Sequence, residues 1–124
     1  MIKICPFVYI SDLASAKNPE LLKANNIKHV ISLGCSLDPV ACDIANNSCM
    51  SFPLLLDTPE QLILDVLLLT SKFMTDIINE QLQHGVDSAH PSNILVHCVY
   101  GQSRSATVIL WLLITDLLAH HRQV

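Results

Sequence analysis

The feature that most constrains the fold is the segment 93–119, in which an apolar strand turns into an apolar helix. Residues 93–97 are rich in strand formers, and residues 103–119 form a long apolar run with helical character. A strand that turns sharply into a helix places the unpaired N–H groups of the helix N-terminus at the turn. The segment therefore predicts a βα unit with an anion-binding position between its two elements.

The loop between Cys98 and Arg104 has a composition that suits an oxyanion. Five residues separate the two side chains, enough chain to curl once around an anion of about the size of phosphate. Gly101 permits backbone angles that a Cβ forbids, and Arg104 can hold two oxygens with its planar fork. We predict that the cradle is formed by the backbone N–H groups of Val99, Tyr100, Gly101, Gln102, Ser103 and Arg104.

Cys98 lies at the bottom of this cradle. A helix N-terminus and a neighbouring cation can lower a cysteine pKa from ~8.5 to roughly 3.5–7.5, so we expect a thiolate at neutral pH. A thiolate that faces a phosphoryl group can attack phosphorus in line and form a phosphocysteine. Ser105 can donate a hydrogen bond to that sulfur and help it leave, whereas His97 is expected to hold the loop in shape. The alternative for Cys98 is an inert buried thiol.

The motif His-Cys-x-x-Gly-x-x-Arg-Ser, at residues 97–105, resembles the signature of cysteine-dependent protein phosphatases. Its ending, residues 103–107, resembles the dual-specificity branch in particular. Upstream, residues 9–12, 18–22 and 27–31 are similar to the opening strand, helix and second strand of that branch, and residues 53–57 to its general-acid segment. The resemblance covers most of the chain and implies the fold and the phosphatase activity of the family.

Asp57 is the predicted general acid, because the leaving group of phosphate-ester cleavage needs a proton as the P–O bond breaks. The same carboxylate can then accept a proton from the attacking water. The alternative role for Asp57 is an interaction with the N-terminus of the helix that starts beside it. Asp65, on an apolar helix face, is the rival acid and is more typical of a structural residue.

Strands alternating with helices predict one α/β domain over residues 1–124, with a largely parallel sheet flanked by helices. We expect strands at 3–10 (broken at Pro6), 27–33, 51–56 and 93–97, a short helix from Asn18, a long helix over 58–84 and a helix over 103–119. Residues 11–17 are expected to be a connecting segment. Sites in such sheets form at the carboxyl ends of the strands, so Cys35, Asp57 and Cys98 are candidates for one crevice.

The charge balance excludes several classes of partner. The formal net charge is −4 with only 7 Lys and Arg, which disfavours nucleic acid and anionic membranes.

The longest apolar stretch, 106–119, is shorter than the roughly 20 residues that span a bilayer. The 5 cysteines match neither a zinc spacing nor a disulfide scaffold. We expect no metal or cofactor, and a cytoplasmic location with the nucleus as an alternative.

The helix at 103–119 is apolar on nearly every side, which is typical of burial on more than one side. The phosphatases that the chain resembles usually continue with further helices packed against this one, so we expect the C-terminal helices to be lacking. The uncovered face predicts a homodimer through the 103–119 helix. The alternatives are a partner protein, or the helix at 58–84 folded over the face.

The uncharged positions Val99, Tyr100 and Gln102 favour phosphoprotein substrates over polyphosphoinositides. No long phosphotyrosine-recognition loop is present, which predicts phosphoserine and phosphothreonine as substrates beside phosphotyrosine. The alternatives are a non-catalytic phosphopeptide-binding module, and a lipid or RNA phosphatase on the same scaffold.

A low-pKa thiolate in an accessible crevice is prone to oxidation, and Cys35 is the candidate partner for a reversible disulfide with Cys98. The alternative for Cys35 is a semi-buried thiol.

Overall fold

The computed structural model describes residues 1–39, 42, 44, 48–52, 60–83, 92–98 and 103–122, with the backbone alone at 60–63, 103–104 and 116–122. Its elements, in chain order, are β1 (Ile2–Cys5), β2 (Val8–Asp12), α1 (Leu13–Ala16), α2 (Pro19–Ala24), β3 (Ile27–Leu33), β4 (Cys49–Phe52), α3 (Glu60–Gln83), β5 (Asn93–Cys98) and α4 (Ser103–Arg122).

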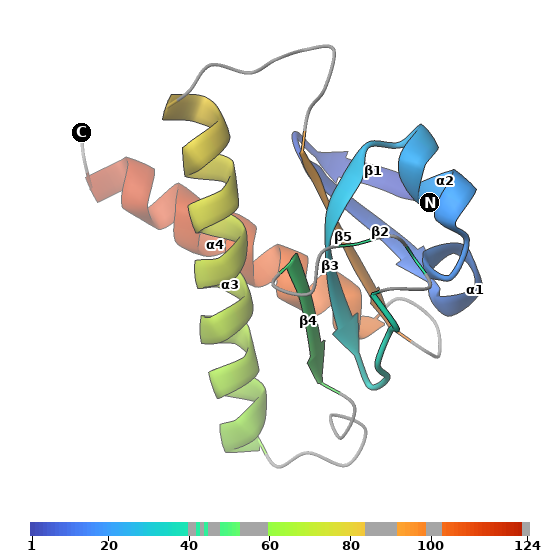
Figure 1. The fold of residues 1–124 in the computed structure, drawn as a ribbon. Helices are drawn as coiled ribbons and strands as arrows, with labels where there is room; N and C mark the ends of the chain where they lie inside the picture. Colours follow the sequence, from blue (N-terminus) through green and yellow to red (C-terminus); the bar gives the residue numbers. More distant parts are fainter. Residues whose placement is uncertain are drawn as a thin grey trace.

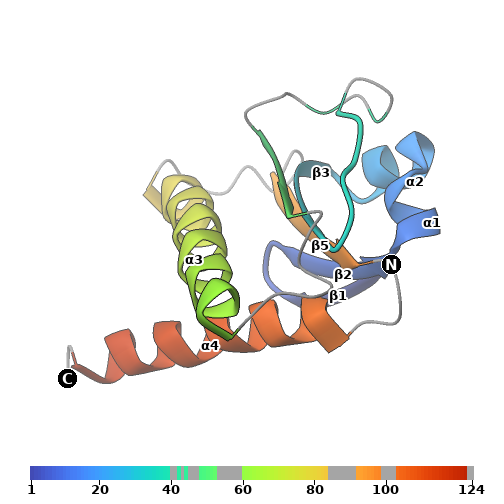
Figure 2. The same cartoon turned by 90° about the horizontal axis from the view of Figure 1, so that it is seen from below.

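The five strands form one sheet in the order β1-β2-β5-β3-β4. Strands β2, β5, β3 and β4 run parallel, and β1 is antiparallel to β2. The short helices α1 and α2 lie on one face of the sheet, and the long helices α3 and α4 on the other (Figures 1 and 2). The predicted α/β class with a largely parallel central sheet is confirmed.

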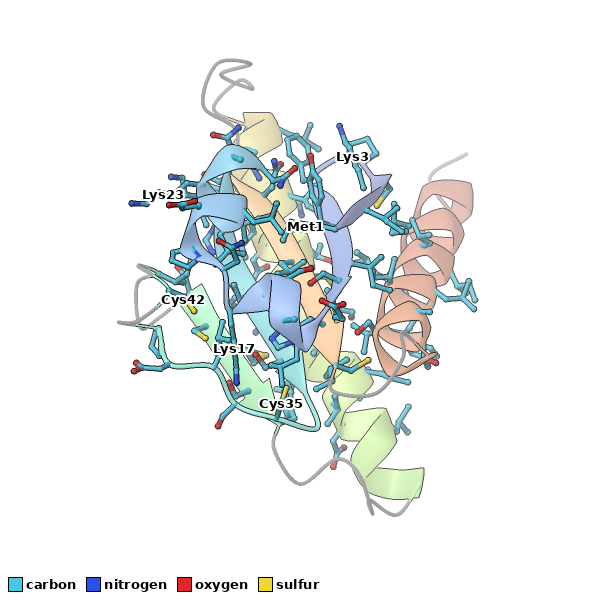
Figure 3. All side chains as sticks on the ribbon, turned by 90° about the vertical axis from the view of Figure 1, so that its right-hand side faces the viewer. Met1, Lys3, Lys17, Lys23, Cys35 and Cys42 are labelled. Carbon is cyan, nitrogen blue, oxygen red and sulfur yellow. The ribbon has the colours of Figure 1, made fainter. Side chains whose placement is uncertain are left out.

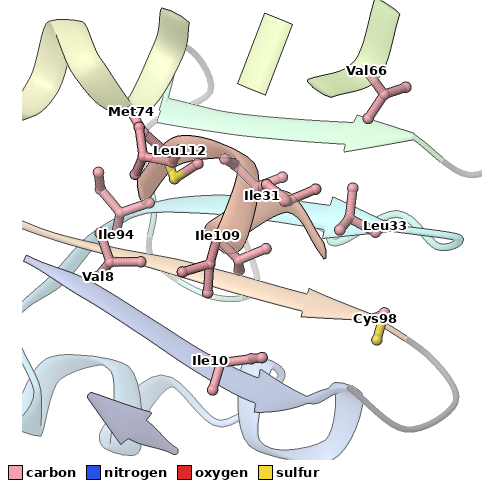
Figure 4. Packing of buried hydrophobic residues seen from close by; sticks show 12 residues of the cluster. Val8, Ile10, Ile31, Leu33, Val66, Met74, Ile94, Cys98, Ile109 and Leu112 are labelled. Atoms are coloured by element: carbon pink, nitrogen blue, oxygen red, sulfur yellow. The ribbon is translucent and has the colours of Figure 1, made fainter. Parts of the chain in front are cut away.

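The central strand β5 has all six residues buried, because sheet neighbours flank both its edges and helices cover both its faces. Side chains alternate between the two faces. Ile94, Val96 and Cys98 belong to the apolar cluster beneath α3 and α4, which is seen from close by in Figure 4. Leu95 packs in the cluster under α1 and α2. The end of β5 is thus held from every side.

The strand expected over 3–10 is broken at Pro6 as predicted, and its two parts, β1 and β2, pair as an antiparallel hairpin. Pro6 has no N–H to donate to a ladder, and Phe7 takes a positive φ of 72° that reverses the chain. Phe7 also accepts a 2.7 Å hydrogen bond from Ile94 N, which fixes the turn against the start of β5.

The segment 11–17 contains α1 and is more than a connection. The Asp12 carboxylate accepts a 2.8 Å hydrogen bond from Ser15 N and caps this short helix. The predicted start of the next helix is confirmed, since the Asn18 side chain accepts hydrogen bonds from Glu20 N and Leu21 N.

Strand β4 corrects the start of the strand expected at 51–56. It begins at Cys49, and all four of its residues are only half-buried. The reason is its place at the edge of the sheet, where β3 is the only described strand that pairs with it. Residues 53–59, which include Asp57 and the predicted helix cap at Thr58, lie outside the described residues.

Helix α4 is apolar all round but is buried on one side. Val108, Ile109 and Leu112 lie in the core cluster, and α3 packs against α4 as one of the alternatives predicted. Leu110, Leu113 and Ile114 remain 40–57% exposed. Within the described part of the chain, no helix is both long enough and apolar enough to cross a membrane.

Candidate active site

The predicted nucleophile stands at the carboxyl end of the central strand. Cys98 pairs in register with Asp12 at the end of β2 and with Leu33 at the end of β3, and the tip of β5 in Figure 4 shows its place. The Cys98 side chain has no exposed surface. It packs in the core cluster under α4. Residues 99–102, which would line the crevice, lie outside the described residues, so the accessible crevice stays a prediction.

His97 is fully buried beside the nucleophile. Its Nε2 lies 2.7 Å from Ser32 Oγ, and its Nδ1 lies 4.0 Å from Cys35 Sγ. Burial lowers the pKa of His97 to about 4, although the Asp12 carboxylate opposes the shift. The imidazole is therefore neutral at pH 7. The loop that it is predicted to hold in shape lies outside the described residues, so this role stays a prediction.

Cys35 follows Gly34, whose φ of 74° turns the chain at the end of β3. Its sulfur faces Leu33 O at 3.8 Å as well as the His97 ring. Burial raises the pKa of the Cys35 thiol; Cys98 adds to the shift and Lys17 opposes it. Cys35 and Lys17 lie at the same end of the molecule (Figure 3). The structure thus brings Cys35 to the edge where β5 ends in Cys98.

Ser105 lies in the first turn of α4 and is fully buried. Its hydroxyl has no hydrogen-bond partner in the described structure, and an unsatisfied buried polar group costs roughly 1–3 kcal/mol. A buried donor of this kind is available to an acceptor that enters the site. No hydrogen bond joins it to the Cys98 sulfur, so its predicted role stays a prediction.

The remaining predicted site residues are only partly described. Arg104 is the second residue of α4, and its backbone alone is described. The cradle positions Val99, Tyr100, Gly101 and Gln102 lie outside the described residues, as does Asp57. The structure thus brings His97, Cys98 and Cys35 together at the carboxyl ends of the parallel strands. Helix α4 begins where the predicted cradle would end.

Two residues at the carboxyl ends of the strands, Asp12 and Ser32, were not predicted as site residues from the sequence. The hydrogen bond from Ser15 N is the main cause of the lowered pKa of Asp12, so this carboxylate stays ionised and is a poor proton donor. Ser32 carries the closest polar contact of His97. Only the strand register could have revealed either of them. The rival acid Asp65 is exposed on α3.

A largely parallel sheet whose central strand ends in a buried His-Cys pair, ahead of a helix with arginine and serine in its first turn, is the arrangement of a cysteine-dependent phosphatase. A family model, "Dual specificity phosphatase, catalytic domain", matches residues 8–120. The chain belongs to this family.

Individual relatives agree with this assignment. The chain is 31% identical over 112 residues to mouse "Dual specificity protein phosphatase 15". The aligned region covers 89% of this chain and 41% of the relative. It is 26% identical over 107 residues to Arabidopsis thaliana "Dual specificity protein phosphatase 1B", covering 83% of this chain and 54% of the relative. The chain thus spans about half or less of the length of these relatives.

The buried histidine predicts a loss of stability in acid. The pKa of His97 is 6.5 in the unfolded chain and about 4 in the folded protein, so between these values the unfolded state binds more protons. The contribution of the buried His97 to the free energy of unfolding is complete above pH 6.5. As the pH falls toward 4, the free energy of unfolding decreases by about 3 kcal/mol. Urea unfolding at stepped pH measures this slope.

The matched variant is His97→Asn, which should show a shallower slope over the same pH range. His29, whose pKa burial also lowers, is retained in both proteins and contributes equally to both slopes. A slope in His97→Asn as steep as that of the parent would contradict the neutral, buried imidazole.

Proposed function

We propose that this protein hydrolyses phosphotyrosine and phosphoserine/phosphothreonine esters of proteins through a phosphocysteine at Cys98. The observation that carries the proposal is the position of Cys98 at the end of the central strand, directly before the cradle sequence and α4. Membership of the dual specificity phosphatase family supports it. The proposed location is the cytoplasm or the nucleus, supported by an odd count of five cysteines whose spacings match no disulfide scaffold.

The proposed reaction has two steps. The Cys98 thiolate forms a bond to phosphorus while the bond from phosphorus to the ester oxygen breaks, and Asp57 gives its proton to that leaving oxygen. A water molecule then attacks phosphorus, Asp57 takes back a proton, and the sulfur leaves with a hydrogen bond from Ser105. The backbone N–H groups of 99–104 and the Arg104 fork hold the phosphoryl oxygens throughout.

A phosphopeptide-binding module without catalysis is the second candidate. It would need the cradle but not the sulfur, and the retention of His97, Cys98, Arg104 and Ser105 together favours the enzyme. A lipid or RNA phosphatase is disfavoured by the uncharged cradle positions and the net charge of −4.

Substitutions at three residues test the reaction on an aryl phosphate. Cys98→Ser should reduce kcat by roughly 10³-fold or more while inorganic phosphate still binds. Arg104→Ala should weaken both binding and turnover, and Arg104→Lys should restore little, because an ammonium lacks the planar fork. Asp57→Asn should slow alkyl phosphates more than activated aryl phosphates, which need less protonation.

The matched control is Cys49→Ser, because Cys49 is a half-buried thiol on the edge strand β4. It should keep the parent activity. If Cys98→Ser turned over substrate as fast as Cys49→Ser does, the phosphocysteine mechanism would be wrong.

For regulation we propose a reversible Cys35–Cys98 disulfide. Hydrogen peroxide accepts two electrons from the Cys98 thiolate, giving a sulfenic acid and hydroxide. The Cys35 thiolate then attacks the oxidised sulfur, the S–S bond forms and hydroxide leaves, and a small dithiol reverses the reaction. The support is the placement of Cys35 at the same sheet edge, where Cys98 influences its pKa.

Peptide mapping after mild peroxide tests this regulation. Because burial raises the pKa of Cys35, more of the disulfide should form at pH 9 than at pH 7. A Cys35→Ser variant should accumulate sulfinic and sulfonic Cys98 instead. The same overoxidised Cys98 in the parent protein, with no linked peptide at either pH, would contradict the proposal.

For assembly we propose a homodimer through the exposed side of α4. Leu110, Leu113 and Ile114 are 57%, 40% and 45% exposed, and covering a large apolar side chain gains about 1.5–3 kcal/mol. Beside Leu113, an apolar pocket of about 320 Å³ lies between α3, α4 and the β1–β2 turn, where a side chain of a second copy would fit.

Sedimentation at micromolar concentration tests the dimer. The parent protein should sediment as a dimer, and Leu110→Asp should shift it toward the monomer. The matched control is Leu69→Asp, because Leu69 is 54% exposed on α3, close to the 57% of Leu110. A parent protein that sediments as a monomer would refute the dimer.

A further inference from the structure

A row of three polar side chains crosses the sheet beside the nucleophile. Ser11 on β2 and Ser32 on β3 both pair in register with His97 on β5. The exposed fractions of the three residues are 1%, 0% and 0%. Alternation along the strands puts this row on the face of α1 and α2, because it continues the rank of Tyr9, Leu95 and Val30 that packs there.

The two serines flank the same ring but make different hydrogen bonds. Ser32 Oγ lies 2.7 Å from His97 Nε2, whereas Ser11 Oγ donates to the carbonyl of Asp12 at 3.0 Å. The other ring nitrogen, Nδ1, has Cys35 Sγ at 4.0 Å, which is a weak contact. Among the described residues, Ser32 is thus the one short hydrogen-bond partner of the imidazole.

A neutral imidazole has one donor nitrogen and one acceptor nitrogen, and a partner on one of them selects the tautomer and the ring orientation. The ring belongs to the residue that immediately precedes Cys98, so a short hydrogen bond from β3 to this ring also restrains the backbone from which the sulfur projects. A displacement of about 1 Å at a reacting atom can cost roughly 10²-fold in rate. A hydroxyl on the neighbouring strand is well placed to prevent that movement.

We infer that Ser32 is a positioning residue, which fixes the tautomer and orientation of His97 and through it the position of the Cys98 sulfur. The inference rests on the proposed function for its effect on turnover, but the contact itself does not depend on catalysis. It assigns to β3 a part in the site that the cradle motif does not contain. Ser11, equally buried and in the same register, serves as the matched control.

The experiment compares Ser32→Ala and Ser11→Ala with the parent protein in three measurements. The first is kcat and KM on an aryl phosphate, the second is the rate at which iodoacetamide alkylates Cys98, and the third is the ¹⁵N NMR signal of the His97 ring. Loss of one hydrogen bond should lower kcat by about ten-fold in Ser32→Ala, with KM changed less than about two-fold.

In Ser32→Ala the alkylation rate should change and the ring signals should shift, and in Ser11→Ala neither should move. Ser32→Thr, which keeps the hydroxyl on a strand that tolerates β-branched residues, should restore the signals of the parent ring. Equal losses of kcat in Ser32→Ala and Ser11→Ala, or parent-like ring signals in Ser32→Ala, would overturn the inference.

Failure of the proposed function would look different. If the parent protein hydrolysed no phosphate ester, the phosphatase proposal would fall, while alkylation of Cys98 and the ring signals of His97 would still decide the role of Ser32. A change in both readouts in Ser32→Ala alone would support the positioning role without any turnover, and unchanged readouts would refute it.

Discussion

The site depends on the burial of β5 at the centre of a parallel sheet. Sheet neighbours hold both edges of this strand, and apolar clusters fill both of its faces. Because hydrogen-bonded ladders fix the register on both sides, the end of β5 cannot shift without breaking β2 and β3 contacts. His97 and Cys98 are the last two residues of that strand, so the packing that stabilises the core also fixes the positions of these two residues.

The alternation of side chains gives those two residues separate surroundings. Cys98 points into the cluster under α3 and α4, whereas His97 belongs to the polar row on the opposite face. The face under α3 and α4 therefore carries the Cys98 sulfur and the start of α4. The opposite face carries Ser32, which we assign to the positioning of His97. Burial keeps the imidazole neutral, and the proposed general acid is Asp57, which lies outside the described residues.

What the sequence predicted well was local in the chain. The strand–loop–helix at 93–119 and the cap at Asn18 depend on residues a few positions apart, and β5, α4 and α2 confirm them. Relations across strands were not predictable in this way. Ser32 and His97 are 65 residues apart, and only the register of β3 against β5 reveals that they meet. The turn at Phe7 was missed because a positive φ at a bulky residue is rare.

The most direct test of the account is to identify the residue that carries phosphoryl during turnover. Asp57→Asn, which should slow release of the intermediate in the proposed mechanism, is mixed with an aryl phosphate, quenched within one turnover and mapped by mass spectrometry. The account predicts one phosphoryl group on the peptide that contains Cys98, absent from Cys98→Ser. Hydrolysis at an undiminished rate with no phosphoryl on Cys98, or with phosphoryl on another residue, would contradict it.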